Sequence, residues 1–120
     1  MLSIALVLTT TSCLPAPEPG WDFASWTIAE LVELDSIPMT RAAQDTQEIC
    51  SGLDGCIEGW ISDQAEITRF ESNANAKKHA ESLTDVYRWH RIVVDFSKGT
   101  TSPEEREWII EYFEGINSWT

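Results

Sequence analysis

The pattern of apolar and polar positions predicts alternating helices and strands along most of the chain. Apolar side chains recur at helical spacing over 21–34, and a second helix is expected over 40–50, where Thr40 would cap it. Two short alternating segments, 56–62 and 65–70, flank a polar turn and predict a β-hairpin.

The second half of the chain predicts a helix, a long strand and a final helix. A polar segment over 74–83 is typical of an exposed helix, and the strongest strand pattern covers 86–97. This strand would place Ile92, Val94 and Phe96 on one face. Its other face would carry Tyr87, Trp89, Arg91 and Val93.

The last helix has the clearest start signal in the sequence. Ser102 is a candidate N-cap, Pro103 fits the first helical position, and Glu105 completes a capping box. We expect this helix to continue to about Glu114 and to end at Gly115.

The order helix, helix, strand, strand, helix, strand, helix predicts an α+β domain. We expect a small sheet of about three strands, made of the hairpin and a crossover strand, with helices packed on it. A parallel crossover would be right-handed. This order is similar to ferredoxin-like and other split α/β sandwich folds.

The N-terminal region has the layout of an export signal. An apolar run over 2–8 precedes small residues over 9–12, Cys13, and a Pro-rich segment over 14–20. The run is too short for a transmembrane helix, which needs about 20 apolar residues. The alternative interpretation is an apolar N-terminus with a buried or incidental cysteine.

The segment Thr10-Thr11-Ser12-Cys13 resembles the bacterial lipobox in its last three positions and has Thr10 where leucine is usual. The first twenty residues are similar to those of small bacterial lipoproteins. The resemblance implies a signal peptide over 1–12, a lipidated Cys13 with a tether over 13–20, and one domain over 21–120. The protein would then be exported and held at the cell membrane by lipid.

Lipidation of Cys13 would leave two of the three cysteines, Cys50 and Cys56, to form a disulfide. The bridge would close a short loop and contribute roughly 2 kcal/mol. Zinc binding and redox chemistry are poorer interpretations, because the sequence has no second cysteine pair and no Cys-x-x-Cys. We therefore expect no metal and no cofactor.

Charge narrows the range of partners. The chain has 20 acidic and 8 basic residues, a formal net charge of −12. This excess argues against binding to nucleic acid or anionic lipid surfaces, and it permits a basic protein partner. Solubility alone is the simpler interpretation.

Catalytic chemistry has little support in the sequence. His79 lies in a polar helix and is expected to face solvent, while His90 lies inside the long strand. The sequence lacks a nucleophile elbow, a His-Glu-x-x-His motif and a glycine-rich phosphate loop. We therefore do not expect an enzyme.

Two surfaces are candidates for binding. One is an acidic stripe on the last helix, opposite an apolar side that would hold Trp108; the simpler interpretation is an ordinary solvated face. The stripe consists of Glu104, Glu107, Glu111 and Glu114.

The other candidate is an aromatic patch on an open face of the sheet. The simpler interpretation, which we favour, is that the helix over 21–34 covers this face. The patch would consist of Trp60, Tyr87, Trp89 and Arg91.

These features together predict a non-enzymatic, membrane-anchored lipoprotein that acts as a binding module at the cell surface. It would act as an inhibitor or immunity-type protein on a basic protein, or as a phage-exclusion-type protein on an envelope component. The alternative is a structural cell-envelope lipoprotein without a dedicated ligand.

Overall fold

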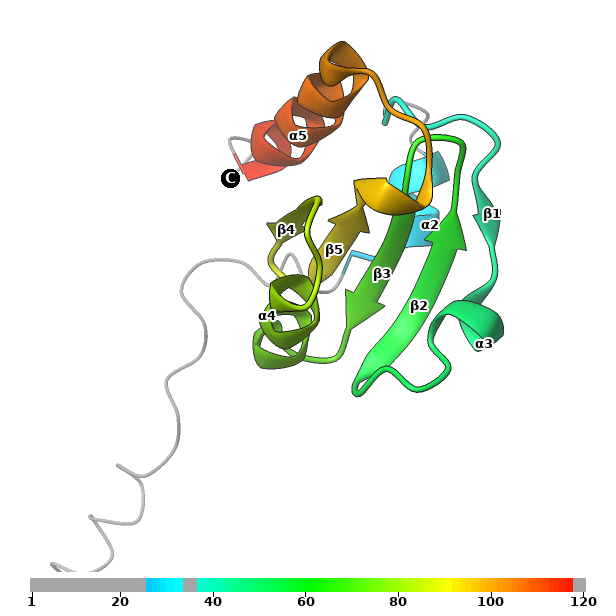
Figure 1. The fold of residues 1–120 in the computed structure, drawn as a ribbon, viewed down its shortest axis with the longest axis vertical. Coiled ribbons are helices and arrows are strands. Elements are labelled where there is room, and N and C mark those ends of the chain that lie inside the picture. Colours follow the sequence, from blue (N-terminus) through cyan, green and yellow to red (C-terminus); the bar gives the residue numbers. More distant parts are fainter. Residues whose placement is uncertain (1–25, 34–36, 118–120) are drawn as a thin grey trace, which may run out of the picture.

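The computed structural model describes residues 26–33 and 37–117, and within these ranges the chain is an α+β protein. The described part centres on an open antiparallel sheet of five strands in the order β1-β2-β3-β5-β4 (Figure 1). Its strands are β1 (Ala43–Gln44), β2 (Cys56–Ile61), β3 (Glu66–Phe70), β4 (Val86–Trp89) and β5 (Ile92–Asp95). The four α-helices described with them are α2 (Ile28–Glu33), α3 (Thr46–Ile49), α4 (Asn73–Glu81) and α5 (Pro103–Asn117). A short 3₁₀ helix, η2 (Phe96–Lys98), follows β5. The expected signal peptide, lipidated Cys13, tether and first part of the helix over 21–34 lie outside the described residues.

The prediction of a three-stranded sheet of ferredoxin-like or split-sandwich type is wrong. All neighbouring strands in the described sheet run antiparallel, so the expected parallel crossover is absent from it. The sheet is larger for two reasons: β1 was not predicted, and the long strand over 86–97 is two strands.

The long predicted strand breaks at His90 and Arg91. Trp89 pairs with Ile92, so His90 and Arg91 between them form a tight turn that joins β4 to β5. His90 has a positive φ of 54° in this turn. Because the chain reverses, Trp89 lies on the same face of the sheet as Ile92. The prediction that Tyr87 and Trp89 lie on the opposite face of the sheet from Ile92 and Val94 is therefore wrong.

The hairpin of β2 and β3 is confirmed, with Trp60 paired to Ile67. The second helix is much shorter than expected, because α3 has four residues and β1 precedes it. Thr40 is not its cap: its backbone N–H donates to Gln64 and its hydroxyl donates to Asp63.

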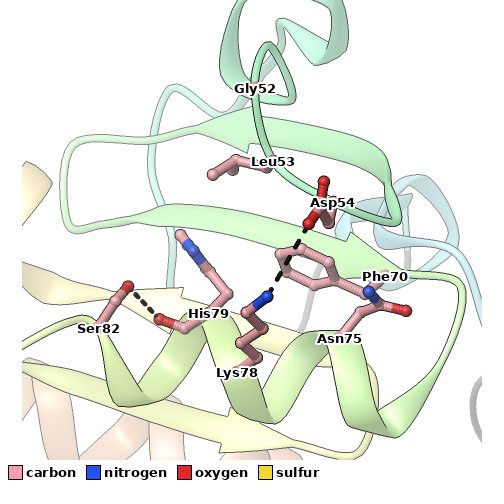
Figure 2. A pocket seen from close by; sticks show the side chains of 8 residues that line it. All are labelled: Gly52, Leu53, Asp54, Phe70, Asn75, Lys78, His79 and Ser82. Atoms are coloured by element: carbon pink, nitrogen blue, oxygen red, sulfur yellow. Dashed lines mark hydrogen bonds and ion pairs between the residues drawn. The ribbon is translucent and has the colours of Figure 1, made fainter.

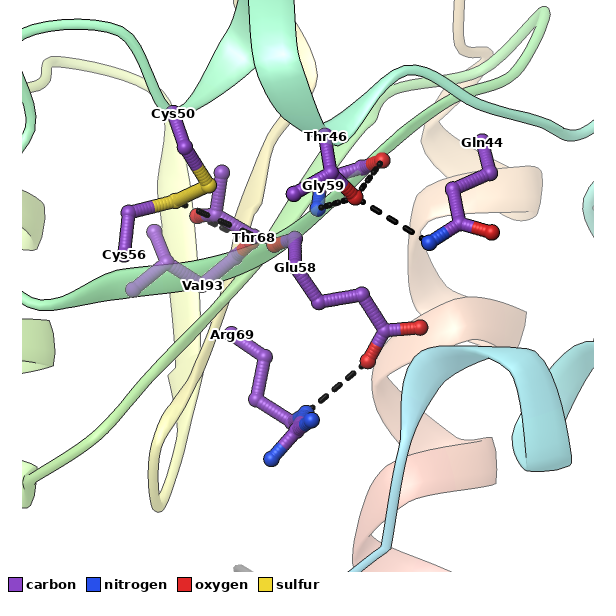
Figure 3. The surroundings of a disulfide bond; sticks show 9 residues. All are labelled: Gln44, Thr46, Cys50, Cys56, Glu58, Gly59, Thr68, Arg69 and Val93. Atoms are coloured by element: carbon purple, nitrogen blue, oxygen red, sulfur yellow. Dashed lines mark hydrogen bonds and ion pairs between the residues drawn. A yellow bond between two sulfur atoms is a disulfide. The ribbon is translucent and has the colours of Figure 1, made fainter.

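The predicted disulfide between Cys50 and Cys56 is confirmed (Figure 3). It joins the C-cap of α3 to the first residue of β2. The bridge therefore fixes the loop over 51–54, which lies between these two elements.

Capping residues explain where the longer helices begin. Ser72 accepts a hydrogen bond from the backbone N–H of Asn75 at the start of α4. Ser102 and Glu105 form the predicted reciprocal capping box at the start of α5. The predicted stop at Gly115 is wrong, because α5 continues through it to Asn117.

The sheet has an apolar layer on each face, and different helices cover the two faces. In Figure 1, α2 lies behind the sheet, and α3 and α4 lie in front of it. The larger core joins α2 and α5 to the sheet and includes Ile28, Leu31, Ile67, Val94, Ile109 and Phe113. The smaller core lies under α4 and includes Phe70, Ala76 and Val93.

Helix α2 is attached to the sheet by a buried carboxylate. Glu58 accepts hydrogen bonds from the backbone N–H groups of Ile28 and Ala29 at 2.9 and 3.0 Å. It also accepts from the Trp60 indole at 2.9 Å and from Arg69 Nε at 2.8 Å (Figure 3 shows the pair with Arg69). Burial raises the pKa of Glu58, but these four donors outweigh it and hold the pKa below its usual range.

The described residues contain no helix that is both long enough and apolar enough to span a membrane.

Candidate functional site

The predicted aromatic patch is not displayed on an open face. Trp89 is 3% exposed, and its ring lies 5.4 Å from that of Phe113 on α5. Tyr87 is half-buried against the same ring at 6.1 Å, and Trp60 is half-buried against the larger core. The open-patch interpretation is therefore wrong, and α5 is part of the cover.

The fourth residue of that set, Arg91, is half-buried in the turn between β4 and β5. Its predicted position was on one face of a strand, beside Tyr87 and Trp89. The turn instead separates it from the sheet positions that face α5.

One glutamate of the predicted stripe is engaged with the sheet. The Tyr87 hydroxyl donates to Glu114 Oε2 at 3.5 Å. Burial, the Glu114 charge and this contact raise the pKa of Tyr87 to about 12, so its hydroxyl stays protonated at neutral pH. Glu114 therefore helps to hold α5 against β4.

The rest of the stripe is exposed and includes a tryptophan. Glu104, Glu107 and Glu111 are all exposed, and Trp108 beside them is 56% exposed. The prediction that Trp108 packs inward is wrong, because it lies four residues after Glu104 and three before Glu111. We call these four residues the acidic face of α5.

The acidic face is not neutralised by the helix that carries it. In the described ranges, none of its three glutamate side chains makes a hydrogen bond or salt bridge with another residue. The basic residue of α5, Arg106, turns away to pair with Asp85 and lies 4.7 Å from the centre of the Phe96 ring. The face combines uncompensated negative charge with a large apolar side chain.

A cleft lies on the other face of the sheet, between α4 and the loop over 51–54. It contains two cavities, of ≈ 190 and ≈ 330 Å³, and both are lined by Leu53 and His79. The disulfide holds one wall of the cleft, and the N-cap at Ser72 sets the start of the other.

The smaller cavity is partly apolar. Figure 2 shows Phe70 and His79 between α4 and Leu53, and the two rings lie 5.2 Å apart. An exposed ion pair between Lys78 and Asp54, at 4.0 Å, crosses from α4 to the loop.

The larger cavity is lined by charged groups from adjacent strands. Glu66 on β3 lies directly opposite Asp95 on β5, and Lys98 of η2 lies at the same cavity. Burial raises the pKa of Glu66; Lys98 opposes this effect and the Asp95 charge adds to it.

Asp95 has one satisfied and one unsatisfied oxygen. The residue is 2% exposed, and its Oδ1 accepts from the backbone N–H and the hydroxyl of Ser97 at 3.0 and 2.6 Å. Its Oδ2 is buried and has no hydrogen-bond partner in the described part of the chain.

His79 does not face solvent as expected. It is half-buried between the two cavities; burial lowers its pKa, and the charge of Asp95 opposes the shift. His90 lies in the β4–β5 turn, with its ring 4.9 Å from that of Trp89.

Sequence analysis missed Glu66, His79 and Asp95 as a group. Each was placed on an element, but the pairing of β3 with β5 that brings the two carboxylates together has no local sequence signal. Among the described residues, no group of three or more His, Cys, Asp or Glu side chains could hold a metal ion.

Comparison with protein-family models, curated proteins and solved structures gives no match.

Proposed function

We propose that the protein is a non-enzymatic, membrane-anchored binding module that recognises a basic protein at the cell surface, as inhibitor and immunity-type proteins do. The observation that carries this proposal is the exposed Trp108 within the acidic face of α5. The absence of a catalytic motif from the sequence supports a binding role.

Two physical arguments support binding through this face. Tryptophan is enriched among the residues that contribute most to protein–protein affinity, because it buries a large area with little loss of side-chain entropy. Negative charge accelerates encounter with a positive partner, and the net charge of −12 extends this attraction beyond the contact surface.

The location is proposed from the sequence around Cys13. A diacylglyceryl group on Cys13 would provide stable anchoring, because two acyl chains bind a bilayer far more tightly than one. We expect the intact mass of protein extracted from membranes to show loss of residues 1–12, gain of lipid and one disulfide. We expect the Cys13→Ser variant to leave the membrane fraction. An unprocessed mass without lipid would contradict the anchor.

The binding role is tested by affinity for cationic secreted enzymes, with a lysozyme as the first probe, using the full chain at low and high salt. We expect affinity to fall steeply with added salt, since surface charges are screened within about 10 Å at 0.1 M. Trp108→Ala should weaken binding by about thirtyfold, the effect of losing a central anchor worth 2 kcal/mol.

Charge reversal distinguishes this face from general attraction to an acidic protein. The pair Glu107→Lys and Glu111→Lys should abolish binding. The same double reversal at Glu71 and Glu81, which are exposed and lie outside α5, makes an equal change in net charge and should have a much smaller effect. Affinity that does not change with salt, or no binding at low salt, would contradict the proposal.

A further inference from the structure

We propose that the larger cavity of the cleft is a binding site for an organic cation, an alkylammonium or alkylguanidinium group held between Glu66 and Asp95. This site lies on the opposite face of the sheet from α5 and does not depend on the proposed function. Four observations carry it: an unsatisfied oxygen, an opposed pair of carboxylates, the net charge of the lining, and its apolar walls.

The unsatisfied oxygen is Asp95 Oδ2. A buried carboxylate oxygen without a donor costs free energy, so such groups in native proteins call for an explanation. Asp95 extends from β5 on the same face as Val93, which packs under α4, and it lines the cavity. A cationic N–H donor in the cavity would supply the missing hydrogen bond.

The second observation is the position of Glu66. It is the direct cross-strand partner of Asp95, and like charges at such positions repel. Glu66 has no side-chain hydrogen bond to another residue in the described ranges. A cation between the two carboxylates would replace repulsion with attraction.

The charges of the lining favour a cation over an anion. The cavity is lined by three carboxylates, from Glu48, Glu66 and Asp95, against the single ammonium of Lys98. With His79 neutral, the lining therefore has a formal charge of −2.

The shape and the walls favour an organic cation over a metal ion. A volume of ≈ 330 Å³ is far larger than a metal ion requires. Ile49, Leu53 and Leu83 also line the cavity, and such side chains suit the methylene stem of a lysine, an arginine or an aliphatic amine. The guanidinium group also matches carboxylates geometrically, since it presents a planar set of donors.

This chemistry has two sources, a free amine or guanidine and a side chain of a protein. Butylammonium and propylguanidinium, each with one positive charge, represent the first. A peptide acetylated and amidated at its ends, with one central arginine as its only charged group, represents the second. Tighter binding of either small cation than of the peptide would indicate a free amine or guanidine, and tighter binding of the peptide would indicate a protein side chain.

Histidine NMR provides a direct readout, because the chain has two histidines. His79 lines the cavity, and His90 lies in the β4–β5 turn, so their ring signals are a probe and an internal control. Titration of the full chain with propylguanidinium should shift the His79 signals saturably and leave those of His90 nearly unchanged.

Isosteric variants assign the effect to the two carboxylates. Asp95→Asn and Glu66→Gln should each weaken binding by about tenfold, the loss of one charge-assisted hydrogen bond. Glu71→Gln makes the same change in net charge at an exposed position outside both cavities and should bind normally. If the Asp95→Asn variant does not fold, the affinity of the Glu66→Gln variant for the cation is the test of the proposal.

Three results would overturn the proposal. One is the lack of a saturable His79 shift up to about 50 mM cation, well beyond the millimolar range of weak specific binding. Another is an equal shift of His79 and His90. The third is an equal loss of affinity in Glu71→Gln and Glu66→Gln, which would mean that net charge alone attracts the cation.

Discussion

Glu66 is partly buried and Glu58 is buried, and their surroundings shift the pKa values of the two carboxyl groups in opposite directions. Glu58 accepts four hydrogen bonds, and its pKa is held below the usual range. Glu66 faces Asp95 across the sheet, and burial raises its pKa. One carboxylate therefore stabilises the fold when ionised, and the other destabilises it.

Replacing Glu66 by Gln should stabilise the folded protein at neutral pH by about 0.5 kcal/mol, because it removes a like-charge pair while keeping the shape. A carboxyl group with a raised folded pKa binds its proton more tightly when folded, so ionisation lowers the stability of the native chain as pH rises. The gain should therefore be largest at neutral pH and disappear below about pH 4, where the glutamate is protonated in both states.

Urea unfolding of the full chain and its Glu66→Gln variant at pH 7 and in acid measures this effect. A variant that is less stable at pH 7 would show that the Glu66 carboxylate has a stabilising partner. The predicted gain also means that one of the two carboxylates proposed to hold the cation lowers the stability of the protein when no cation is bound.

Individual side chains show the limits of reading a face from sequence. The stripe of glutamates on α5 is predictable because helical spacing is regular, and all four of its glutamates are exposed. Trp108 was placed on the packed side because it is apolar, although its spacing from Glu104 places it on the stripe. The helical spacing was therefore a better guide to the position of Trp108 than its hydrophobicity.

At the scale of elements, α2 illustrates how a short helix depends on its neighbours. Six residues are too few for a stable isolated helix in water. Glu58 satisfies two of its N-terminal backbone N–H groups and is itself held by Arg69. Ile28 and Leu31 then bury one side of the helix in the larger core.

Glu58→Gln should destabilise the protein by about 3 kcal/mol, since it leaves the largely buried Arg69 guanidinium without its counter-charge. The folded pKa of Glu58 is lowered, so its contribution is present in full above about pH 5 and is lost as pH falls through the lowered pKa. The difference between wild type and variant should therefore narrow in acid.

Thermal unfolding of both proteins across this pH range provides the measurement, and hydrogen exchange at Ile28 and Ala29 reports the attachment of α2 directly. Equal stability of the two proteins at pH 7 would mean that the network contributes nothing net.

Elements with local signals were predictable, and elements that depend on distant partners were not. The starts of α4 and α5 follow from caps at Ser72 and Ser102, and the β2–β3 hairpin follows from alternation around a polar turn. The β4–β5 turn lacks the glycine, asparagine or aspartate that favours positive φ, and His90 adopts it within the tertiary structure.

At the scale of the whole molecule, the sheet separates two surfaces with different chemistry. The face covered by α2 and α5 presents Trp108 with carboxylates outside, and the face covered by α4 contains the cavity with Glu66 and Asp95. Each surface can be changed by substitution without touching the other. A protein partner and a small cation could therefore be bound at the same time.

The topology could not be predicted because its decisive pairing is non-local. Strands β3 and β5 are joined through α4 and β4, and their register, with Ile67 opposite Val94, depends on packing against both layers. The alternation of residues located the two strands of the hairpin and the extended region over 86–97, but it showed neither the turn inside that region nor the neighbours of each strand in the sheet.

The edge of the sheet formed by β1 beside β2 bears on how the protein behaves at high concentration. Strand β1 pairs with only the last two residues of β2. Asp45 and Thr46 then form hydrogen bonds with Gly59 of β2, and the first residue of β2, Cys56, is in the disulfide. The opposite edge, β4, is four residues long and carries the exposed charge of Arg88. Neither flank offers a long template for intermolecular strand pairing, so crowding should not drive self-association or fibril growth through this sheet.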